Sequence, residues 1–296
     1  MRVLVTGAAG FFGSHVVRRL IADGDEAIAA VRPGSRATRL EDVRDRCTVV
    51  ELELTEAAAA ADVLGAHPPD AVVHLAWYAE PGRYRRALGE NVDSLTGTAR
   101  VLLAAAETGC PRVVLGGTCL EHSTASNRQM YEAAKGAAHG LADGFNGGGL
   151  STACGHVFYL YGPFEDERRV VPAVIRSVLA GEPIATTTGV QRRDYLHVSD
   201  VAAAFVAIAR STIKGGVDIC SGSLVTLADV LGIIGDETGR PELIRVGQLG
   251  ETADDGYAAA GDPGPLRQLG WRPRHDLRAG IKETIAWWTA RQEAYP

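Results

Sequence analysis

The feature that constrains the fold most is a glycine-rich stretch directly after the first apolar segment. Residues 2–6 read RVLVT and predict a buried strand, and residues 14–24 predict a helix that a glycine ends. Between them, glycines recur at every third position, at Gly7, Gly10 and Gly13. Such a turn lets the backbone approach an anion that the helix N-terminus attracts. The pattern predicts a dinucleotide-binding loop, with a purely structural glycine turn as the alternative.

Strand and helix patterns then alternate along the chain. Strands are predicted at 26–31, 47–54, 70–77, 112–118 and 151–162, and helices at 95–109, 131–145, 197–209 and 226–238. This alternation predicts βαβ units and an α/β fold with a doubly wound parallel sheet, the Rossmann fold. We expect an NAD(P)-binding domain over residues 1–155 and a smaller substrate-binding domain over 156–296. Segments near 190–220 are expected to return to the first domain.

Composition and charge narrow the class of protein. The 296 residues are 46% hydrophobic and 22% charged, which is typical of soluble globular proteins. The net charge of -6 offers no basic field for nucleic acid. The longest apolar run, residues 201–209, is about half of the roughly 20 residues that a membrane-spanning helix needs. The N-terminus lacks a signal-peptide pattern, so we expect a cytoplasmic protein without nucleic-acid or membrane partners.

The cysteines give no sign of a metal site or a disulfide framework. There are five, at Cys47, Cys110, Cys119, Cys154 and Cys220. Their number is odd, they are widely spaced, and no two form a CxxC pair. We therefore expect reduced packing residues and no bound metal.

The turn after the second predicted strand indicates which dinucleotide binds. A carboxylate there suits the ribose 2′-hydroxyl of NAD, and arginine suits the 2′-phosphate of NADP. The turn contains Arg32, Ser35 and Arg36 and no carboxylate. We expect NADP (NADPH) in preference to NAD, with a solvated turn as the alternative. Glu53, near the end of the next predicted strand, is expected to accept a hydrogen bond from the adenine amino group.

A tyrosine and a lysine form the candidate catalytic pair. Tyr131 and Lys135 stand four residues apart, on one face of a predicted helix. Lys135 is one of only three lysines among 30 basic residues. An ammonium beside a phenol favours the phenolate, so we expect a lowered pKa of Tyr131 and proton exchange with a substrate oxygen. Thr118 ends a predicted strand, and its hydroxyl is expected to join the same network.

These segments together resemble the extended short-chain dehydrogenases/reductases, in the group of nucleotide-sugar epimerases, dehydratases and reductases. The matching pieces span almost the whole chain: TGAAGFFG at 6, HLAW at 74, FYLYGP at 158, RDYLHVSDV at 193, and LGWRP with GIKETIAWW near the end. The resemblance implies that Thr118 and Tyr131 contact the sugar oxygen that is oxidised or reduced. It implies that Lys135 contacts the nicotinamide ribose.

The resemblance also implies the rest of the site. Arg193 is implied to bind the substrate diphosphate, an ion pair with Asp194 being the alternative, and Cys119 and Tyr159 are placed beside the substrate. The implied cofactor-binding set is Gly7, Gly10, Phe11, Phe12, Gly13, Arg32, Ser35, Arg36, Glu53, Leu75, Ala76, Trp77, Tyr131 and Lys135. A homodimer through the helices at 95–109 and 130–146 is implied as well.

The chain also departs from the family pattern. The 4,6-dehydratases carry an Asp-Glu pair after the threonine, whereas here Cys119 and Leu120 follow it, so dehydration is not expected. His156 and Tyr159 stand where the family often has Arg and Asn. Trp77 replaces a small residue, and near the nicotinamide it would restrict how a sugar ring turns.

The leading hypothesis is NADPH-dependent reduction of the C4 keto group of a nucleotide-activated, deoxygenated sugar. The hydride is expected from the nicotinamide and the proton from Tyr131. A nucleotide-sugar 4-epimerase with tightly bound NAD(P) is the first alternative. A redox-sensing regulator that binds NADPH without chemistry is the second.

Overall fold

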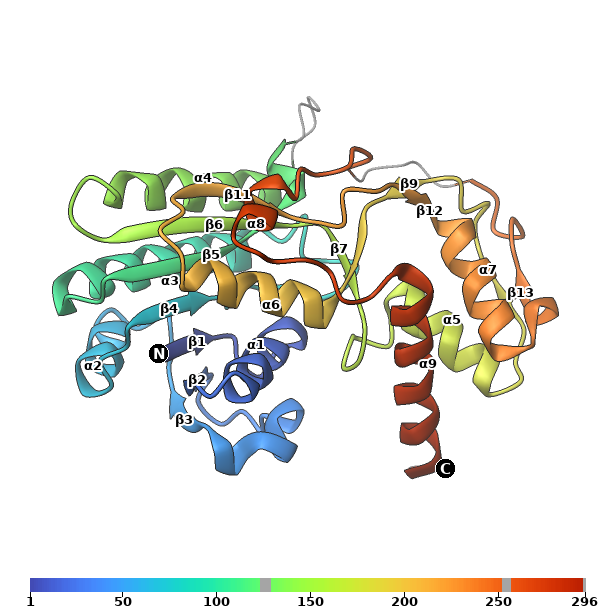
Figure 1. Cartoon of the computed structure of the whole chain (residues 1–296), viewed down its shortest axis with the longest axis horizontal. Coiled ribbons are helices and arrows are strands. Elements are labelled where there is room, and N and C mark those ends of the chain that lie inside the picture. The colour runs from blue at the N-terminus through green and yellow to red at the C-terminus, as the bar shows by residue number, and fades with distance from the viewer. Residues whose placement is uncertain (123–128, 252–256, 295–296) are drawn as a thin grey trace.

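A single parallel sheet forms the centre of the molecule. The structure is a computed structural model that describes residues 1–122, 129–251 and 257–294. The seven strands are β1 (Arg2–Thr6), β2 (Glu26–Val31), β3 (Thr48–Glu51), β4 (Ala71–His74), β5 (Arg112–Thr118), β6 (Ser151–Val157) and β11 (Gly215–Ile219). Their order is β3-β2-β1-β4-β5-β6-β11, and all neighbours pair in parallel (Figure 1). The predicted doubly wound α/β fold is confirmed, and its strand order reverses between β1 and β4.

Helices cover both faces of this sheet. Helices α1 (Phe11–Ala22) and α6 (Val198–Ala209) pack together on one face, and α2 (Ala59–Ala66), α3 (Leu88–Thr108) and α4 (Met130–Phe145) pack on the other (Figure 1). Alternate strand residues enter the two cores, as the pleat requires. Val3 and Val5 join the core beside α1, and Leu4 joins the core beside α2 and α3. After residue 197 the chain therefore returns to the sheet, through α6 and β11.

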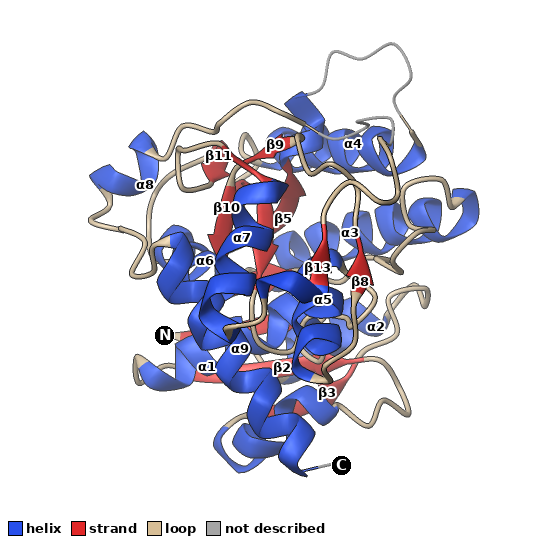
Figure 2. Ribbon diagram, turned by 90° about the vertical axis from the view of Figure 1, so that its right-hand side faces the viewer, coloured by secondary structure: helices blue, strands red, loops and turns tan. Residues whose placement is uncertain are grey.

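A second, smaller core lies beyond the carboxyl ends of the strands. Helices α5 (Val170–Leu179), α7 (Leu227–Thr238) and α9 (Leu277–Ala294) enclose it, and they lie in front in Figure 2. Short strand pairs connect this part: β7 (Tyr159–Tyr161) with β10 (Tyr195–His197), β8 (Ile184–Ala185) with β13 (Ile244–Arg245), and β9 (Arg192–Arg193) with β12 (Val225–Thr226). The other elements are α8 (Gly264–Gln268) and the 3-10 helices η1 (Thr38–Arg46), η2 (Cys119–His122) and η3 (Pro241–Leu243).

Some predicted elements differ from the observed ones. The predicted strand 151–162 is two strands, because β7 leaves the central sheet to pair with β10. The predicted strands 47–54 and 70–77 are shorter in the structure, as β3 and β4. The last three residues of each predicted strand lie in the loop that follows. Helix α5 was not predicted; its Pro172 lies in the first turn, where no amide donor is needed.

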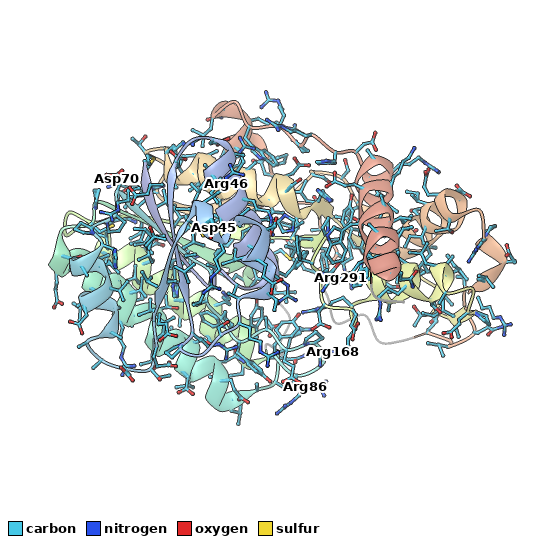
Figure 3. The ribbon with its side chains drawn as sticks, turned by 90° about the horizontal axis from the view of Figure 1, so that it is seen from below. Asp45, Arg46, Asp70, Arg86, Arg168 and Arg291 are labelled. Atoms are coloured by element: carbon cyan, nitrogen blue, oxygen red, sulfur yellow. The ribbon has the colours of Figure 1, made fainter. Side chains whose placement is uncertain are left out.

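The surface carries charges of both signs. Exposed side chains include Asp45, Arg46, Asp70 and Arg86 (Figure 3). Within the described ranges, no helix is both long and apolar enough to cross a bilayer.

Candidate active site

The glycine loop lies at the point where the strand order reverses. Gly7 has φ +65°, a conformation that favours glycine, and a Cβ there would lie 2.9 Å from the amide nitrogen of Ala76. A Cβ at Gly13 would lie 2.2 Å from the Gly7 oxygen, so α1 packs directly on the loop. Gly10 is the N-cap of α1. A tight loop and a helix N-terminus at a switch point fit a dinucleotide pyrophosphate.

His74 holds the next loop in place. Its Nδ1 lies 2.8 Å from Thr6 Oγ1, and its Nε2 lies 3.0 Å from Thr98 Oγ1. Thr6 Oγ1 also accepts hydrogen bonds from the backbone of Leu75 and Ala76, at 3.1 and 3.2 Å. Burial lowers the pKa of His74 to about 3, so the ring is neutral at pH 7. His74 therefore joins the ends of β1 and β4 and is a structural residue.

The two phenylalanines of the loop point away from its backbone donors. The Phe12 ring packs edge-on against Phe205 at 4.8 Å between centroids, in the core under α6. The Phe11 ring lies edge-on to His15 at 6.0 Å. Their backbone amides, and not their rings, remain at the N-terminus of α1.

The turn after β2 exposes the three polar side chains expected at the adenosine ribose. Arg32, Ser35 and Arg36 are all exposed. Glu53 Oε1 accepts hydrogen bonds from the Thr55 amide and hydroxyl, at 2.9 and 2.7 Å, and these bonds lower the pKa of Glu53. Glu53 thus stabilises its own turn. Both hydrogen bonds from Thr55 go to the same carboxylate oxygen.

Thr118 and Tyr131 meet at the carboxyl end of β5. Thr118 is the last residue of that strand, and Tyr131 lies in the first turn of α4. Their side chains share a hydrogen bond. The Tyr131 ring lies edge-on to Tyr84 at 4.8 Å and to Trp77 at 6.3 Å between centroids. Two aromatic rings from the segment between β4 and α3 therefore pack against the phenol.

The expected lowering of the Tyr131 pKa is wrong for this arrangement. Desolvation, and then Tyr84, raise the pKa of Tyr131 well above its usual range, although the Thr118 hydrogen bond opposes them. The Lys135 ammonium donates to the Gly116 oxygen at 2.5 Å. Tyr131 is therefore a neutral phenol at pH 7.

Trp77 covers the ammonium of Lys135. The Lys135 Nζ lies 3.9 Å from the indole centroid and 5.8 Å from the Tyr131 ring centroid. Burial lowers the pKa of Lys135 to about 8. Trp77 Nε1 donates to Asn91 Oδ1 at 2.8 Å, and Asn91 Nδ2 donates to the backbone oxygen of Tyr84 at 2.7 Å. This chain of hydrogen bonds fixes the plane of the indole.

Two of the implied substrate residues, Cys119 and Tyr159, lie in one small cluster. Cys119 is buried, and Tyr131 and Tyr159 pack against the same small cluster. The Arg193 guanidinium lies 5.0 Å from the Tyr159 ring centroid and is only 7% exposed. The neighbouring Asp194 carboxylate accepts hydrogen bonds from the backbone of Ser221 at 2.7 Å and of Gly222 at 2.9 Å.

A groove of about 470 Å³ lies next to β9, and Arg192 of that strand lines it. Its lining mixes polar and apolar residues, and the others are Thr187, Thr188, Val190, Gln191, Leu224, Glu251 and Ala258. Arg193 is the next residue of β9, so the groove adjoins the strand that carries this arginine.

Sequence reasoning missed several residues that shape the site. Tyr84 lies in the irregular segment between β4 and α3, where no periodicity marks a residue. Asn91 is a fully buried polar residue on α3. Its hydrogen bond with Trp77 is seen only in the folded chain. Asp194 was weighed only as a partner of Arg193, whereas its carboxylate holds two loops.

Comparison with known proteins places this site in a family. The model of the NAD dependent epimerase/dehydratase family matches residues 3–219. A dTDP-glucose 4,6-dehydratase of Shigella flexneri is 26% identical, with 98% of this chain and 93% of the relative covered. A CDP-abequose synthase of Salmonella muenchen is 22% identical, with 96% and 97% covered.

Solved structures share the fold over the full length. A dTDP-glucose 4,6-dehydratase of Streptomyces venezuelae with NAD bound has a TM-score of 0.87 at 24% identity, with 100% of this chain and 99% of that chain covered. A UDP-glucose 4-epimerase of Thermus thermophilus in complex with NAD has a TM-score of 0.84 at 24% identity, with 97% and 99% covered. The resemblance to extended short-chain dehydrogenases/reductases is confirmed, and the chain belongs to the NAD dependent epimerase/dehydratase family.

Proposed function

We propose that this chain is an NADPH-dependent ketoreductase acting at C4 of a nucleotide-activated, deoxygenated sugar. The observation that carries the proposal is the tethered Trp77 indole, held between Lys135 and the Tyr131 ring. An epimerase must let its ketose intermediate present both faces to the cofactor, whereas a reductase needs only one. A bulky side chain fixed by Asn91 restricts that rotation and favours reduction.

Tyr131 is the proton donor in this proposal. A bound reduced nicotinamide supplies the hydride. The desolvated phenol is protonated at pH 7 and can donate to the oxygen that develops at C4. The Thr118 hydroxyl, already bonded to Tyr131, orients the same oxygen. Lys135 has three N–H donors and uses one on Gly116, so it can also bind ribose hydroxyls and stabilise the transient phenolate, which solvent reprotonates.

The residues after Thr118 do not support elimination of water. Burial raises the pKa of the Cys119 thiol to about 12, and Leu120 has no titratable group. Glu121 Oε1 accepts from the Thr118 amide at 2.8 Å. Although burial opposes it, hydrogen bonds with two histidines hold the pKa of Glu121 well below its usual range. None of these groups can supply a proton as the second acid of a dehydratase does.

The preference for NADPH rests on the exposed Arg32 and Arg36. Two guanidinium groups at the end of β2 suit a 2′-phosphate better than a bare hydroxyl. The solved relatives described above hold NAD, so this turn is where the chain is proposed to differ from them.

The nucleotide diphosphate of the substrate is assigned to Arg193 and to the groove that the neighbouring Arg192 lines. A buried guanidinium binds a diphosphate in bidentate fashion. The volume of about 470 Å³ lies within the range of small-molecule sites. Residues 156–296 then supply most substrate contacts, and residues 1–155 supply most cofactor contacts.

We also propose a homodimer through α3 and α4. The two helices pack side by side on one face of the sheet (Figure 1). Leu103 on α3 is 51% exposed and Leu141 on α4 is 38% exposed. Sedimentation of Leu103→Glu should show a monomer if these helices form the interface, and an unchanged dimer would exclude them.

The decisive experiment offers NADPH and a panel of nucleotide-linked 4-keto-6-deoxy sugars to the purified protein. We expect loss of the reduced-nicotinamide absorbance, matched mole for mole by a new hydroxyl at C4. Tyr131→Phe should lower kcat/KM by about 10²- to 10⁴-fold. Tyr161→Phe, which removes a buried hydroxyl bonded to the Leu277 oxygen, is the matched control and should retain activity.

Other outcomes select the alternatives. Full activity in Tyr131→Phe would refute the proton-donor role. Conversion of saturated nucleotide sugars by a tightly bound cofactor, without net NADPH loss, would identify a 4-epimerase. NADPH binding without turnover of any ketosugar would indicate a regulator.

A further inference from the structure

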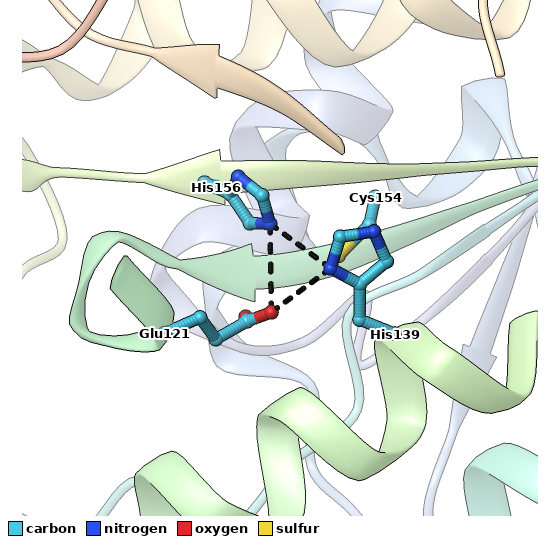
Figure 4. A group of neighbouring side chains, drawn as sticks. All are labelled: Glu121, His139, Cys154 and His156. Carbon is cyan, nitrogen blue, oxygen red and sulfur yellow. Dashed lines mark hydrogen bonds and ion pairs between the residues drawn. The ribbon is translucent and has the colours of Figure 1, made fainter. Parts of the chain in front are cut away.

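One turn along α4 from Lys135, four metal-ligating side chains converge from three neighbouring elements. This cluster consists of Glu121 on η2, His139 on α4, and Cys154 and His156 on β6 (Figure 4). One ligand atom from each residue lies within 4.8 Å of the other three. Cys154 and His156 are 2% and 5% exposed, and Glu121 and His139 are partly buried, so protein covers most of the cluster.

Three of the four ligand atoms form a nearly equilateral triangle. His139 Nδ1 lies 3.2 Å from Glu121 Oε2 and 3.2 Å from His156 Nε2, and His156 Nε2 lies 3.4 Å from Glu121 Oε2. A tetrahedral zinc ion with nitrogen and oxygen ligands at about 2.0–2.1 Å has edges of about 3.3–3.4 Å. A proton can join only two of these atoms in a hydrogen bond, whereas one metal ion can bind all three.

Polar groups lie beside the second polar atom of Glu121, His139 and His156. The second ring nitrogen of His139 lies 3.6 Å from Asp143 Oδ2, and that of His156 lies 3.4 Å from Asp218 Oδ1. The second oxygen of Glu121 accepts from the Thr118 amide. Histidines that bind metals usually direct their free nitrogen at a carboxylate or carbonyl in this way.

Two glycines make room for the cluster. A Cβ at Gly117 would lie 2.6 Å from Cys154 Sγ and 2.9 Å from Glu121 Oε1. A Cβ at Gly216 would lie 2.6 Å from His156 Cε1 and 3.0 Å from Cε1 of the other histidine. The missing side chains of these two glycines therefore leave space for the converging side chains.

We propose that Glu121, His139, Cys154 and His156 form a closed, four-ligand site for a zinc-class divalent ion. A thiolate, a carboxylate and two neutral imidazoles offset the two charges of Zn²⁺, so the buried site carries no net charge. Thiolate and imidazole ligands select zinc over magnesium or calcium. The Cys154 proton is released to solvent on binding. The site does not depend on which reaction the chain catalyses.

Cobalt substitution of the full-length protein tests the site. After dialysis against a chelator, titration with Co²⁺ should saturate at about one equivalent. Tetrahedral d–d bands and a thiolate-to-cobalt charge-transfer band should appear together, and Zn²⁺ should erase both. Cys154→Ser should abolish the charge-transfer band. Cys110→Ser, at another buried cysteine, is the matched control and should retain it.

A second variant leaves all four proposed ligands unchanged. Asp218→Asn should weaken Co²⁺ binding by about 10- to 100-fold, as loss of an orienting carboxylate does. Circular dichroism confirms that each protein is folded. Folded wild-type protein without a charge-transfer band would overturn the proposal, as would a band that persists in folded Cys154→Ser. The cluster would then be a metal-free network in which a His156 imidazolium lies between Glu121 and Asp218. Because the wild-type band decides whether a thiolate binds the ion, the test does not depend on whether the variants fold.

Discussion

Replacing Asp194 with alanine should loosen the loops that flank Arg193. The Asp194 side chain is fully buried. Its Oδ1 accepts from the amide and the hydroxyl of Ser221, both at 2.7 Å. Its Oδ2 accepts from the Gly222 amide at 2.9 Å and from the Gly261 amide at 3.4 Å. One carboxylate thus joins β9 to two loops that are distant in sequence.

The size of the effect follows from two opposing contributions. Three short hydrogen bonds at roughly 1–1.5 kcal/mol each favour the folded state by about 3–4 kcal/mol. Burial raises the pKa of Asp194 despite these bonds, so removing the buried carboxyl group returns part of this free energy. We therefore expect Asp194→Ala to lower the free energy of unfolding by about 2 kcal/mol. Asp194→Asn keeps one acceptor oxygen and should cost about half as much.

Urea unfolding at pH 7, followed by circular dichroism, measures this loss. Asp93→Ala, at an exposed position on α3, is the control and should stay within about 0.5 kcal/mol of wild type. In the reductase assay, Asp194→Ala should raise KM for the nucleotide sugar more than it lowers kcat, because Arg193 is displaced while Tyr131 is not. A loss below about 0.5 kcal/mol in Asp194→Ala would refute the reasoning, since water would then replace the carboxylate without cost.

Three further predictions concern the loop, a buried acid and the cofactor. Gly13→Ala should abolish NADPH binding measured by fluorescence, because its Cβ would lie 2.2 Å from the Gly7 oxygen. Gly65→Ala in α2 is the control: its Cβ meets open space, and the change should raise the free energy of unfolding by about 0.5–1 kcal/mol. Burial raises the pKa of Glu165 from 4.5 to about 8, so the stability that its neutral form contributes is complete below pH 4.5 and is lost as the pH rises through 8. In urea unfolding, Glu165→Gln should gain stability relative to wild type between pH 5 and 9, and the exposed Glu167→Gln should show no such trend. Arg32→Glu should raise KM for NADPH by at least about tenfold and leave NADH less affected; equal changes would contradict the 2′-phosphate assignment.

The sheet was predictable because most of its strands are short apolar runs that the sequence itself shows. The strands at 2–6, 26–31 and 112–118 have the predicted bounds, since each is a short apolar run that ends in a loop. The run 151–162 gives no sign of its break. At Phe158 the backbone still bonds to β11, through the Ile219 oxygen, and one residue later it pairs with β10. Hydrophobicity shows that a strand is buried but not which neighbour it pairs with.

The meeting of Thr118 with Tyr131 was predictable, but the electrostatics around them were not. Thr118 and Tyr131 do meet, as spacing and resemblance indicated. The Tyr131 pKa was predicted in the wrong direction, because desolvation depends on Trp77 and Tyr84, which come from an irregular loop. The expectation of no metal rested on cysteine spacing, and spacing does not show that Cys154 lies beside two histidines and a glutamate in the folded chain.

Helix α4 links the proposed reaction site to the proposed metal site. Tyr131, Lys135, His139 and Asp143 recur every four residues and so share one face of the helix. The first two face the aromatic loop, and the last two belong to the metal cluster and its outer partners. Because catalysis tolerates displacements of only about 1 Å, an ion that holds His139 against β6 also fixes the reach of Lys135 one turn away. The metal would then affect the reaction through the position of α4 and not through direct contact with the substrate.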